Sequence, residues 1–140
     1  MSFSDPYSPA WEPLLGAAWQ AWDRAYAPYS GFRVGAALLR DDGTIVPGCN
    51  VENASYPVAL CAERTAVCAA VSQGMAAGEL VALVVVTEAQ VPTPPCGACR
   101  QVLAEFAEDL PILLANRSDR SVCSIRDLLP RAFTRRDLAP

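Results

Sequence analysis

The sequence predicts an α/β fold in which a mixed sheet lies between layers of helix. Helical and strand-like patterns alternate along the chain, and no linker or internal repeat divides its 140 residues. The continuous apolar run at residues 80–87 is typical of a strand that is covered on both faces. Because 52% of the residues are hydrophobic, we expect one complete core and a single domain over residues 1–140.

A helix is expected near the start of the chain. Ser8 followed by Pro9 is a common helix start, and apolar residues then recur at helical spacing to about Tyr26. The sequence PYSG at residues 28–31 ends the pattern. The tryptophans of this segment are expected to lie in the core or in a subunit contact: Trp11, Trp19 and Trp22.

A β-hairpin is expected next. Residues 33–40 and 44–49 predict two strands, because the Asp-Asp-Gly sequence at residues 41–43 between them is a strong turn signal. Residues 50–60 are expected to be irregular, since Pro57 excludes a regular element there.

The second half of the chain predicts further alternation of helices and strands. Helices are expected over residues 61–73, where Gly74 marks the end, and over residues 96–108 after a rigid proline-rich loop at 92–95. The other expected elements are strands at residues 80–87, 111–115 and 120–123 and a short helix at 125–129. The prediction is therefore a five-stranded mixed sheet.

The charge balance argues against a nucleic-acid partner. The chain has 11 basic and 15 acidic residues, a net charge of −4, and a pI near 4.7. Proteins that bind polyanions rely on a basic stripe that neutralises phosphates, and the sequence shows none. The arginines at residues 131–136 are interrupted by other residues and followed by Asp137, which is typical of a solvated tail.

The sequence also predicts the cellular compartment of the protein. The first residues lack the basic and apolar segments of a signal peptide. The longest apolar stretch, residues 80–86, is far shorter than the ~18–20 residues that span a bilayer. We therefore expect a cytoplasmic protein without a membrane partner. In that reducing compartment the six cysteines are expected to be metal ligands or buried thiols, not disulfides.

Two cysteine motifs indicate a metal site. Cys61 and Glu63 lie in CAER, and Cys96 and Cys99 lie in PPCGACRQ, while the chain contains no histidine. Both motifs stand where a loop becomes a predicted helix, and free N–H groups at a helix start favour a thiolate. Three thiolates leave one position open on Zn²⁺, as catalytic zinc sites do. A carboxylate two residues from a ligand suits hydrolytic zinc chemistry, so Glu63 is the candidate catalytic residue.

Other interpretations of these motifs remain open at this point. A C-x-x-C pair alone is also typical of a redox pair or a zinc knuckle, although no fourth ligand is apparent. Cys68 would lie ~10.5 Å along the helix from Cys61, so Cys68 and Cys123 are expected to be small buried hydrophobic residues. Arg64 is a candidate donor of hydrogen bonds to a thiolate sulfur, with a surface ion pair as its alternative role.

Longer motifs carry a family resemblance. The segments YSGFRVGAA, GCNVENASY, CAERTA, PCGACRQ and LLPRAF occur in this order over most of the chain. With them the chain resembles the cytidine deaminases that act on free nucleosides, in their small form with three cysteine ligands. The pairing of a ligand-x-Glu motif with P-C-x-x-C is shared more widely by zinc nucleobase deaminases. The absence of histidine excludes the branch that uses one histidine and two cysteines.

The resemblance implies a three-layer α/β/α fold with a five-stranded sheet, and a role for each motif. Cys61, Cys96 and Cys99 would hold one zinc ion, and Glu63 would move protons between water, the pyrimidine N3 and the leaving amine. The implied substrate-binding residues are Ala62, whose backbone would hold the 2-oxo group, Asn50 and Glu52 for the ribose 3′-hydroxyl, Phe32 for the pyrimidine ring, and Tyr56 and Phe133 for a neighbouring subunit's site.

The activity implied by the resemblance is hydrolytic deamination of cytidine and 2′-deoxycytidine, with release of ammonia, by a homotetramer in pyrimidine salvage. One alternative is a deaminase of a modified cytosine nucleoside such as blasticidin S. An alternative from another class is a non-catalytic zinc-binding interaction module. One residue departs from the family pattern, because Pro94 stands where a serine usually precedes the Pro-Cys of the second motif. The change matters if a side-chain hydroxyl contacts the amino group.

Overall fold

The computed structural model describes residues 2–139, whose strands form one five-stranded mixed sheet. The strand order is β2–β1–β3–β4–β5, with β3 and β4 parallel and the other neighbours antiparallel. The strands are β1 (Gly35–Arg40), β2 (Ile45–Cys49), β3 (Leu80–Val86), β4 (Pro111–Ala115) and β5 (Arg120–Ser124). The predicted fold class and the mixed sheet are confirmed.

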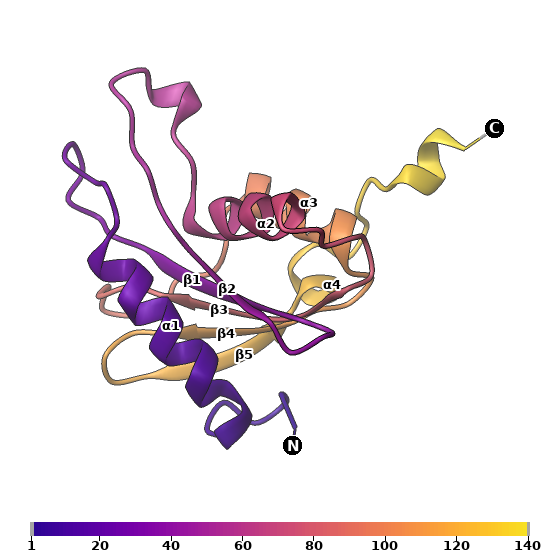
Figure 1. The fold of residues 1–140 in the computed structure, drawn as a ribbon, viewed down its shortest axis with the longest axis horizontal. Helices are drawn as coiled ribbons and strands as arrows, with labels where there is room; N and C mark the ends of the chain where they lie inside the picture. Colours follow the sequence, from indigo (N-terminus) through magenta and orange to yellow (C-terminus); the bar gives the residue numbers. More distant parts are fainter. Residues whose placement is uncertain (1, 140) are drawn as a thin grey trace.

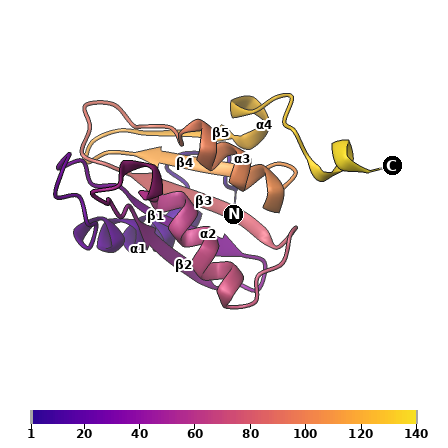
Figure 2. The same ribbon diagram turned by 90° about the horizontal axis from the view of Figure 1, so that it is seen from above.

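Helices cover both faces of the sheet, so the architecture has three layers. Helix α1 (Glu12–Asp23) lies on one face, and α2 (Ala62–Ser72) and α3 (Gly97–Phe106) lie on the other, near the short α4 (Ile125–Leu128) (Figure 1). Figure 2 shows α2 and α3 side by side above the sheet. No helix within residues 2–139 has the length and apolar character needed to cross a membrane.

The alternation of side chains along the strands divides the core into two clusters, because successive strand residues point to opposite faces. On the α1 face, Val84 and Leu113 pack with the fully buried Trp11. On the opposite face, Leu83 and Ile112 pack in the cluster that includes α2 and α3. Trp19 and Trp22 are partly buried and pack against the α1 cluster, as expected for core residues.

Several element boundaries differ from the prediction, most of them by one or two residues. The first helix begins as a 3-10 helix at Pro9–Trp11, and α1 ends at Asp23 because Tyr26 forms a β-bridge with Val51 instead. The segment predicted to be irregular contains a 3-10 helix at Tyr56–Val58. Pro57 is tolerated in the first turn of this 3-10 helix, because a backbone N–H at that position would have no helical partner. A further 3-10 helix, Arg135–Leu138, lies in the predicted solvated tail.

Two glycines allow the helices to lie unusually close to the sheet. A Cβ atom at Gly48 of β2 would lie 2.4 Å from the amide nitrogen of Ala66 and 2.5 Å from the carbonyl oxygen of Ala62. A Cβ atom at Gly35 of β1 would lie 2.0 Å from the carbonyl oxygen of Ala18 in α1. Gly48 therefore sets the distance between the sheet and the first turns of α2, which carry the first cysteine motif.

Strand β2 is an edge strand that contains a proline. Pro47 is paired with Ala37 of β1. Hydrogen-bonded pairs alternate with non-bonded pairs in an antiparallel ladder. Because Arg40 N–H donates to Thr44 and Asn50 N–H donates to the carbonyl of Val34, the Ala37–Pro47 pair is a non-bonded one. The Pro47 nitrogen therefore points away from β1, where a strand proline is tolerated.

Candidate metal centre and active site

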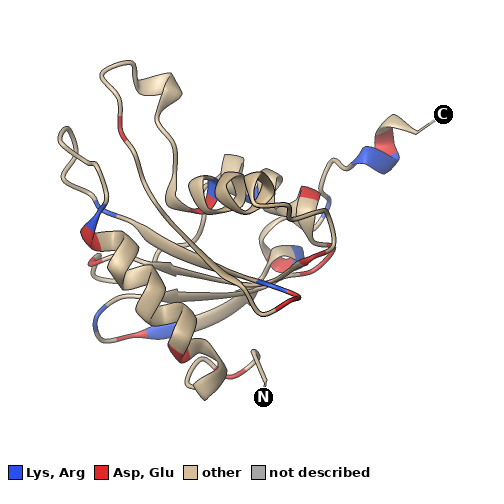
Figure 3. Ribbon diagram, in the orientation of Figure 1, with Lys and Arg blue, Asp and Glu red and all other residues tan. Residues whose placement is uncertain are grey.

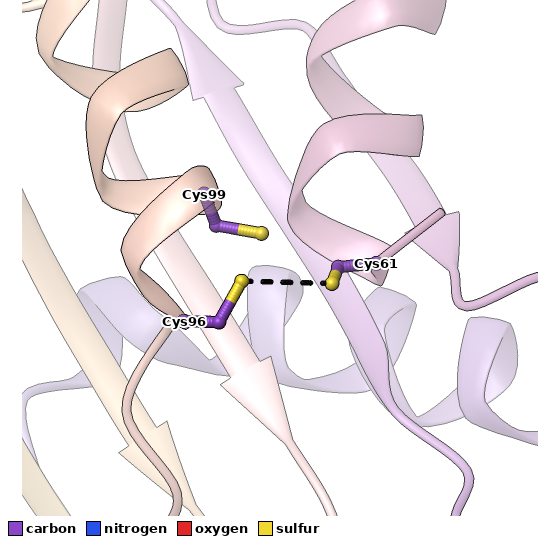
Figure 4. A group of neighbouring side chains, drawn as sticks. All are labelled: Cys61, Cys96 and Cys99. Atoms are coloured by element: carbon purple, nitrogen blue, oxygen red, sulfur yellow. Dashed lines mark hydrogen bonds between the residues drawn. The ribbon is translucent and has the colours of Figure 1, made fainter. Parts of the chain in front are cut away.

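The three cysteines of the two motifs meet at the starts of α2 and α3. Cys61 is the N-cap residue of α2, Cys96 is the N-cap residue of α3, and Cys99 lies in the first turn of α3. Their sulfurs lie within 4.8 Å of one another, and the Cys61 and Cys96 sulfurs are 3.7 Å apart. Figure 4 shows all three side chains pointing into the same space.

This spacing fits a tetrahedral metal ion. Zn–S bonds of ~2.3 Å place two sulfur ligands of a tetrahedral zinc roughly 3.8 Å apart. The candidate metal-binding group in the described chain contains these three residues and no fourth ligand. Cys68 is exposed on α2, so its predicted burial is wrong, while Cys123 is half-buried in β5. No two of the six cysteines are joined in a disulfide in residues 2–139.

The three sulfurs lie so close together that the ionisation of one opposes the ionisation of the others. Hydrogen bonds from Cys99 and from Arg64 lower the pKa of Cys61 to about 5, against the opposing effect of burial. The hydrogen bond that Cys99 donates to Cys61, together with burial, raises the pKa of Cys99 well above its usual range. One thiolate therefore forms readily while its neighbour keeps its proton. All three can ionise together only if positive charge is placed among them.

Arg64 supplies part of that positive charge. Its Nη2 atom donates a hydrogen bond of 3.4 Å to the Cys61 sulfur. This bond raises the pKa of the guanidinium further above its usual value. The Nε atom of Arg64 is buried and has no hydrogen-bond partner among residues 2–139. The structure thus places Arg64 on the sulfur cluster, and its side chain is in none of the ion pairs of the described residues.

Glu63 lies in the first turn of α2 with only 4% of its surface exposed. Burial raises the pKa of its carboxyl group to about 7. A carboxyl group with such a pKa can both accept and release a proton near neutral pH. The structure therefore brings together four of the predicted groups, namely the three sulfurs and the buried carboxyl group of Glu63.

The start of α2 is tied to the end of β2 by a residue that sequence reasoning missed. The Thr65 hydroxyl lies 2.7 Å from the carbonyl oxygen of Cys49 and 2.8 Å from that of Ala62. Its position in CAERTA, directly after Arg64, is the signal that could have identified it.

Arg100 has a corresponding place beside the second motif. Its Nε donates to the carbonyl of Pro95 at 2.8 Å, and its Nη1 donates to the carbonyl of Leu128 at 3.0 Å. The side chain therefore holds the loop that leads into Cys96 against the end of α4. Arg100 directly follows Cys99 in the sequence, and this position could have drawn attention to it. Pro94, in the same loop, is exposed.

Asn50 and Glu52 hold the loop that carries Phe32. The side-chain oxygen of Asn50 accepts from the N–H of Val34, and its amide nitrogen donates to the carbonyl of Phe32, both at 2.8 Å. Glu52 accepts from the N–H groups of Tyr29 and Ser30, at 2.9 and 3.2 Å, and from the Ser30 hydroxyl. Phe32 is 45% exposed at the tip of this loop.

Tyr56 and Phe133 lie on exposed, protruding segments. Tyr56 is 72% exposed and contacts Tyr29 edge to face, with ring centroids 6.1 Å apart. Phe133 is 59% exposed, and its carbonyl accepts a 2.7 Å hydrogen bond from Gln101. The C-terminal segment projects from the body of the molecule in both ribbon views (Figures 1 and 2). Both aromatic rings are thus available to another molecule.

Fold and site together define a small α/β protein with three sulfurs that could bind a metal ion and an adjacent buried carboxyl group. Residues 11–113 match the zinc-binding region of the cytidine and deoxycytidylate deaminases. The chain belongs to this family.

Individual relatives agree over nearly the whole chain. It is 48% identical to the cytidine deaminase of Sporosarcina psychrophila over 91% of this chain and 94% of that protein. It is 50% identical to that of Mycobacterium tuberculosis over 91% and 92% of the two chains. The crystal structure of cytidine deaminase from Burkholderia pseudomallei matches with a TM-score of 0.84 and 51% identity, over 86% of this chain and 97% of that one.

Proposed function

We propose that the protein catalyses the hydrolytic deamination of cytidine and 2′-deoxycytidine to uridine and 2′-deoxyuridine, with release of ammonia. The main evidence is that three cysteine sulfurs lie within 4.8 Å of one another and that the buried Glu63 lies beside them. A closed structural zinc site would use a fourth protein ligand, and the metal-binding group of the described chain has three. The identity of close to half with proteins named cytidine deaminase supports the substrate class.

Cys61, Cys96 and Cys99 would hold one zinc ion per chain. When bound, zinc lowers the pKa of a water molecule so that it can act as the nucleophile. Three thiolates exceed the charge of a divalent ion by one negative charge, which opposes the loss of a proton from that water. The hydrogen bond from Arg64 to the Cys61 sulfur withdraws part of this excess charge.

Glu63 would carry the protons of the reaction. It would accept one proton from the attacking water and deliver it to N3 of the pyrimidine ring. It would then take the second proton from the hydroxyl group added at C4 and deliver it to the amino group, as the C4–N bond breaks, the C4=O bond forms and ammonia leaves. A carboxyl group with a pKa of about 7 suits both directions of transfer. Glu63 lies in the first turn of α2, and Cys61 is the N-cap residue of the same helix, so the helix holds the carboxyl group beside the proposed metal ligand.

The nucleoside would lie between the start of α2 and the loops at residues 26–34 and 50–60. Phe32 would pack against the pyrimidine ring, and the backbone of Ala62 would hold the 2-oxo group. Asn50 and Glu52 would bind the ribose 3′-hydroxyl, in addition to holding the loop of Phe32.

Assembly into a homotetramer would cover the exposed apolar surface of these loops. Residues 26–32 and 53–60 contain no charged residue (Figure 3). They carry several of the exposed large hydrophobic side chains, namely Tyr26, Tyr29, Phe32, Tyr56, Val58 and Leu60. Exposed apolar groups gathered in one area mark interaction surfaces. Tyr56 and Phe133 would then complete the site of a neighbouring copy.

The protein would work in the cytoplasm, in pyrimidine salvage. The reducing conditions of that compartment keep cysteine thiols free to bind a metal ion.

The test is the change in cytidine absorbance with purified protein, before and after treatment with a zinc chelator. Deamination of cytidine and 2′-deoxycytidine that stops with the chelator and returns with zinc is the expected result. Blasticidin S belongs in the same substrate panel. Turnover of blasticidin S with none of cytidine would reassign the substrate, and zinc content without turnover of any nucleoside would favour the interaction module.

A further inference from the structure

The loops at residues 26–34 and 50–60 are joined by a chain of hydrogen bonds that runs through Ser30. The backbone N–H of Phe32 donates to the Ser30 hydroxyl oxygen at 3.0 Å. The Ser30 hydroxyl in turn donates to Oε2 of Glu52. A single hydroxyl therefore links the residue proposed to contact the base with the residue proposed to contact the sugar.

The remaining contacts of Glu52 give this hydroxyl a specific task. Oε1 accepts the two backbone N–H groups of Tyr29 and Ser30, which hold one end of the carboxylate. A carboxylate offers roughly four acceptor positions on its two oxygens. With the Ser30 hydroxyl on Oε2, one position on that oxygen is left for another donor, and the rotation of the group is fixed.

The same contacts keep Glu52 charged. The hydrogen bond from Ser30, followed by those from the two backbone N–H groups, lowers the pKa of Glu52. An ionised carboxylate with one fixed, vacant acceptor position is suited to a sugar hydroxyl, because hydrogen bonds to charged acceptors are shorter and stronger than those to neutral ones.

We propose that Ser30 is a positioning residue that sets the preference for a nucleoside with a 3′-hydroxyl, by orienting Glu52 and coupling it to Phe32. This inference rests on the proposed function, which assigns Glu52 to the sugar. In the proposed binding mode Ser30 itself would contact Glu52 and Phe32 and no reacting atom. The two backbone N–H bonds to Glu52 and the bonds of Asn50 to Phe32 and Val34 do not involve its side chain. The loop can therefore keep its fold when the hydroxyl is removed.

The experiment measures kcat and KM for cytidine and 3′-deoxycytidine in the zinc-loaded enzyme. Ser30→Ala should raise the KM for cytidine roughly 3–10-fold with little change in kcat, which is the range for one lost hydrogen bond. The KM for 3′-deoxycytidine should stay unchanged, so the preference for the 3′-hydroxyl falls. Ser30→Thr, which keeps the hydroxyl, should restore it. Ser72→Ala is the matched control, since the Ser72 hydroxyl bonds only Ala69 at the far end of α2.

Glu52→Gln separates failure of this inference from failure of the proposed function. If Glu52→Gln abolishes the preference and Ser30→Ala keeps it, the inference is wrong and the role of Glu52 stands. If Glu52→Gln also keeps the preference, the assignment of Glu52 is wrong and the inference falls with it. An equal rise in KM for both substrates in Ser30→Ala would mean that Ser30 only shapes the loop. If Ser30→Ala does not fold, Ser30→Cys, a near-isostere with a much weaker donor, replaces it in the same comparison.

Discussion

The metal end and the nucleoside end of the proposed site are built in different ways. Cys61, Cys96 and Glu63 stand at the starts of helices that pack on the sheet, and Glu63 is almost fully buried. Phe32 and Tyr56 lie on exposed segments that are held by isolated β-bridges and by side-chain hydrogen bonds to backbone groups, and not by a full strand ladder or a core.

This difference separates chemistry from recognition. A metal ligand or proton carrier must be held within a fraction of an ångström, which regular elements and close packing achieve better than loops. Loops can instead adjust to a substrate and be completed by another copy of the chain. The two ends should therefore respond differently to mutation.

The largest effect is expected at the metal end, from Glu63→Gln. The amide has the shape of the carboxyl group but cannot accept and return a proton, so turnover should fall at least ~10²–10⁴-fold. Zinc content and thermal stability should stay near those of the wild type. Steady-state kinetics with metal analysis measures this, and Glu105→Gln, on the exposed side of α3, is the control. A zinc-loaded variant within a few-fold of normal turnover would contradict the role of Glu63.

Arg64→Ala tests the charge balance at the sulfurs. Loss of a group that hydrogen-bonds to a metal ligand typically costs ~10–100-fold in activity or metal affinity. We expect lower kcat with an almost unchanged KM, since Arg64 contacts Cys61 and not the loops. Arg126→Ala is the control, because Arg126 is exposed on α4. Unchanged kcat at full zinc occupancy would show that Arg64 has no part in the reaction.

Gly48→Ala tests how closely α2 must lie to the sheet. The new Cβ would overlap backbone atoms of Ala62 and Ala66, so the free energy of unfolding should fall by about 1–3 kcal/mol. The free energy of unfolding, measured with denaturant, and the zinc content should fall together, because Cys61 moves with α2. Gly16→Ala is the control, since nothing lies within 4 Å of its Cβ position and alanine favours an exposed helix. Equal stability of the two variants would mean that Gly48 is not required for the packing.

The smallest effect is expected from Phe133→Ala, at the part of the nucleoside end that a neighbouring copy of the chain would complete. Most interface truncations cost about 1 kcal/mol or less, so KM for cytidine should rise less than ~10-fold while zinc content is kept. Light scattering should give a tetramer for the wild type. An active monomer would refute the assembly and with it the role of Phe133 in a neighbouring site.

The metal end could be predicted from sequence because its motifs are recognisable by themselves. The C-x-x-C spacing at a loop-to-helix transition places Cys96 and Cys99 on one helix turn. Cys61 lies 35 residues before Cys96, and it was linked to them because two thiolates need a third ligand and because Glu63 stands two residues away. Burial was harder to predict, as Cys68 shows. The buried positions of α2 include Ala62, Ala66 and Ala70, and Cys68 lies on the opposite side of the helix.

The nucleoside end was less accessible to sequence reasoning. Glu52 and Ser30 are 22 residues apart, and Asn50 and Val34 are 16 apart. Such contacts depend on how the hairpin returns the chain to the end of α1, which no local pattern encodes. The family resemblance suggested that Asn50 and Glu52 bind a sugar, but not that their side chains also hold the loop of Phe32.

Pro47 has a consequence for how copies of the chain can meet. Its nitrogen lies on the outer edge of β2 and offers no hydrogen to an incoming strand. Two copies therefore cannot extend their sheets into one continuous sheet through a regular ladder on this edge. Proline on an edge strand also protects against the strand-to-strand pairing that begins aggregation. The chain can therefore expose apolar loops to a specific partner while Pro47 prevents unspecific strand pairing along the β2 edge of its sheet.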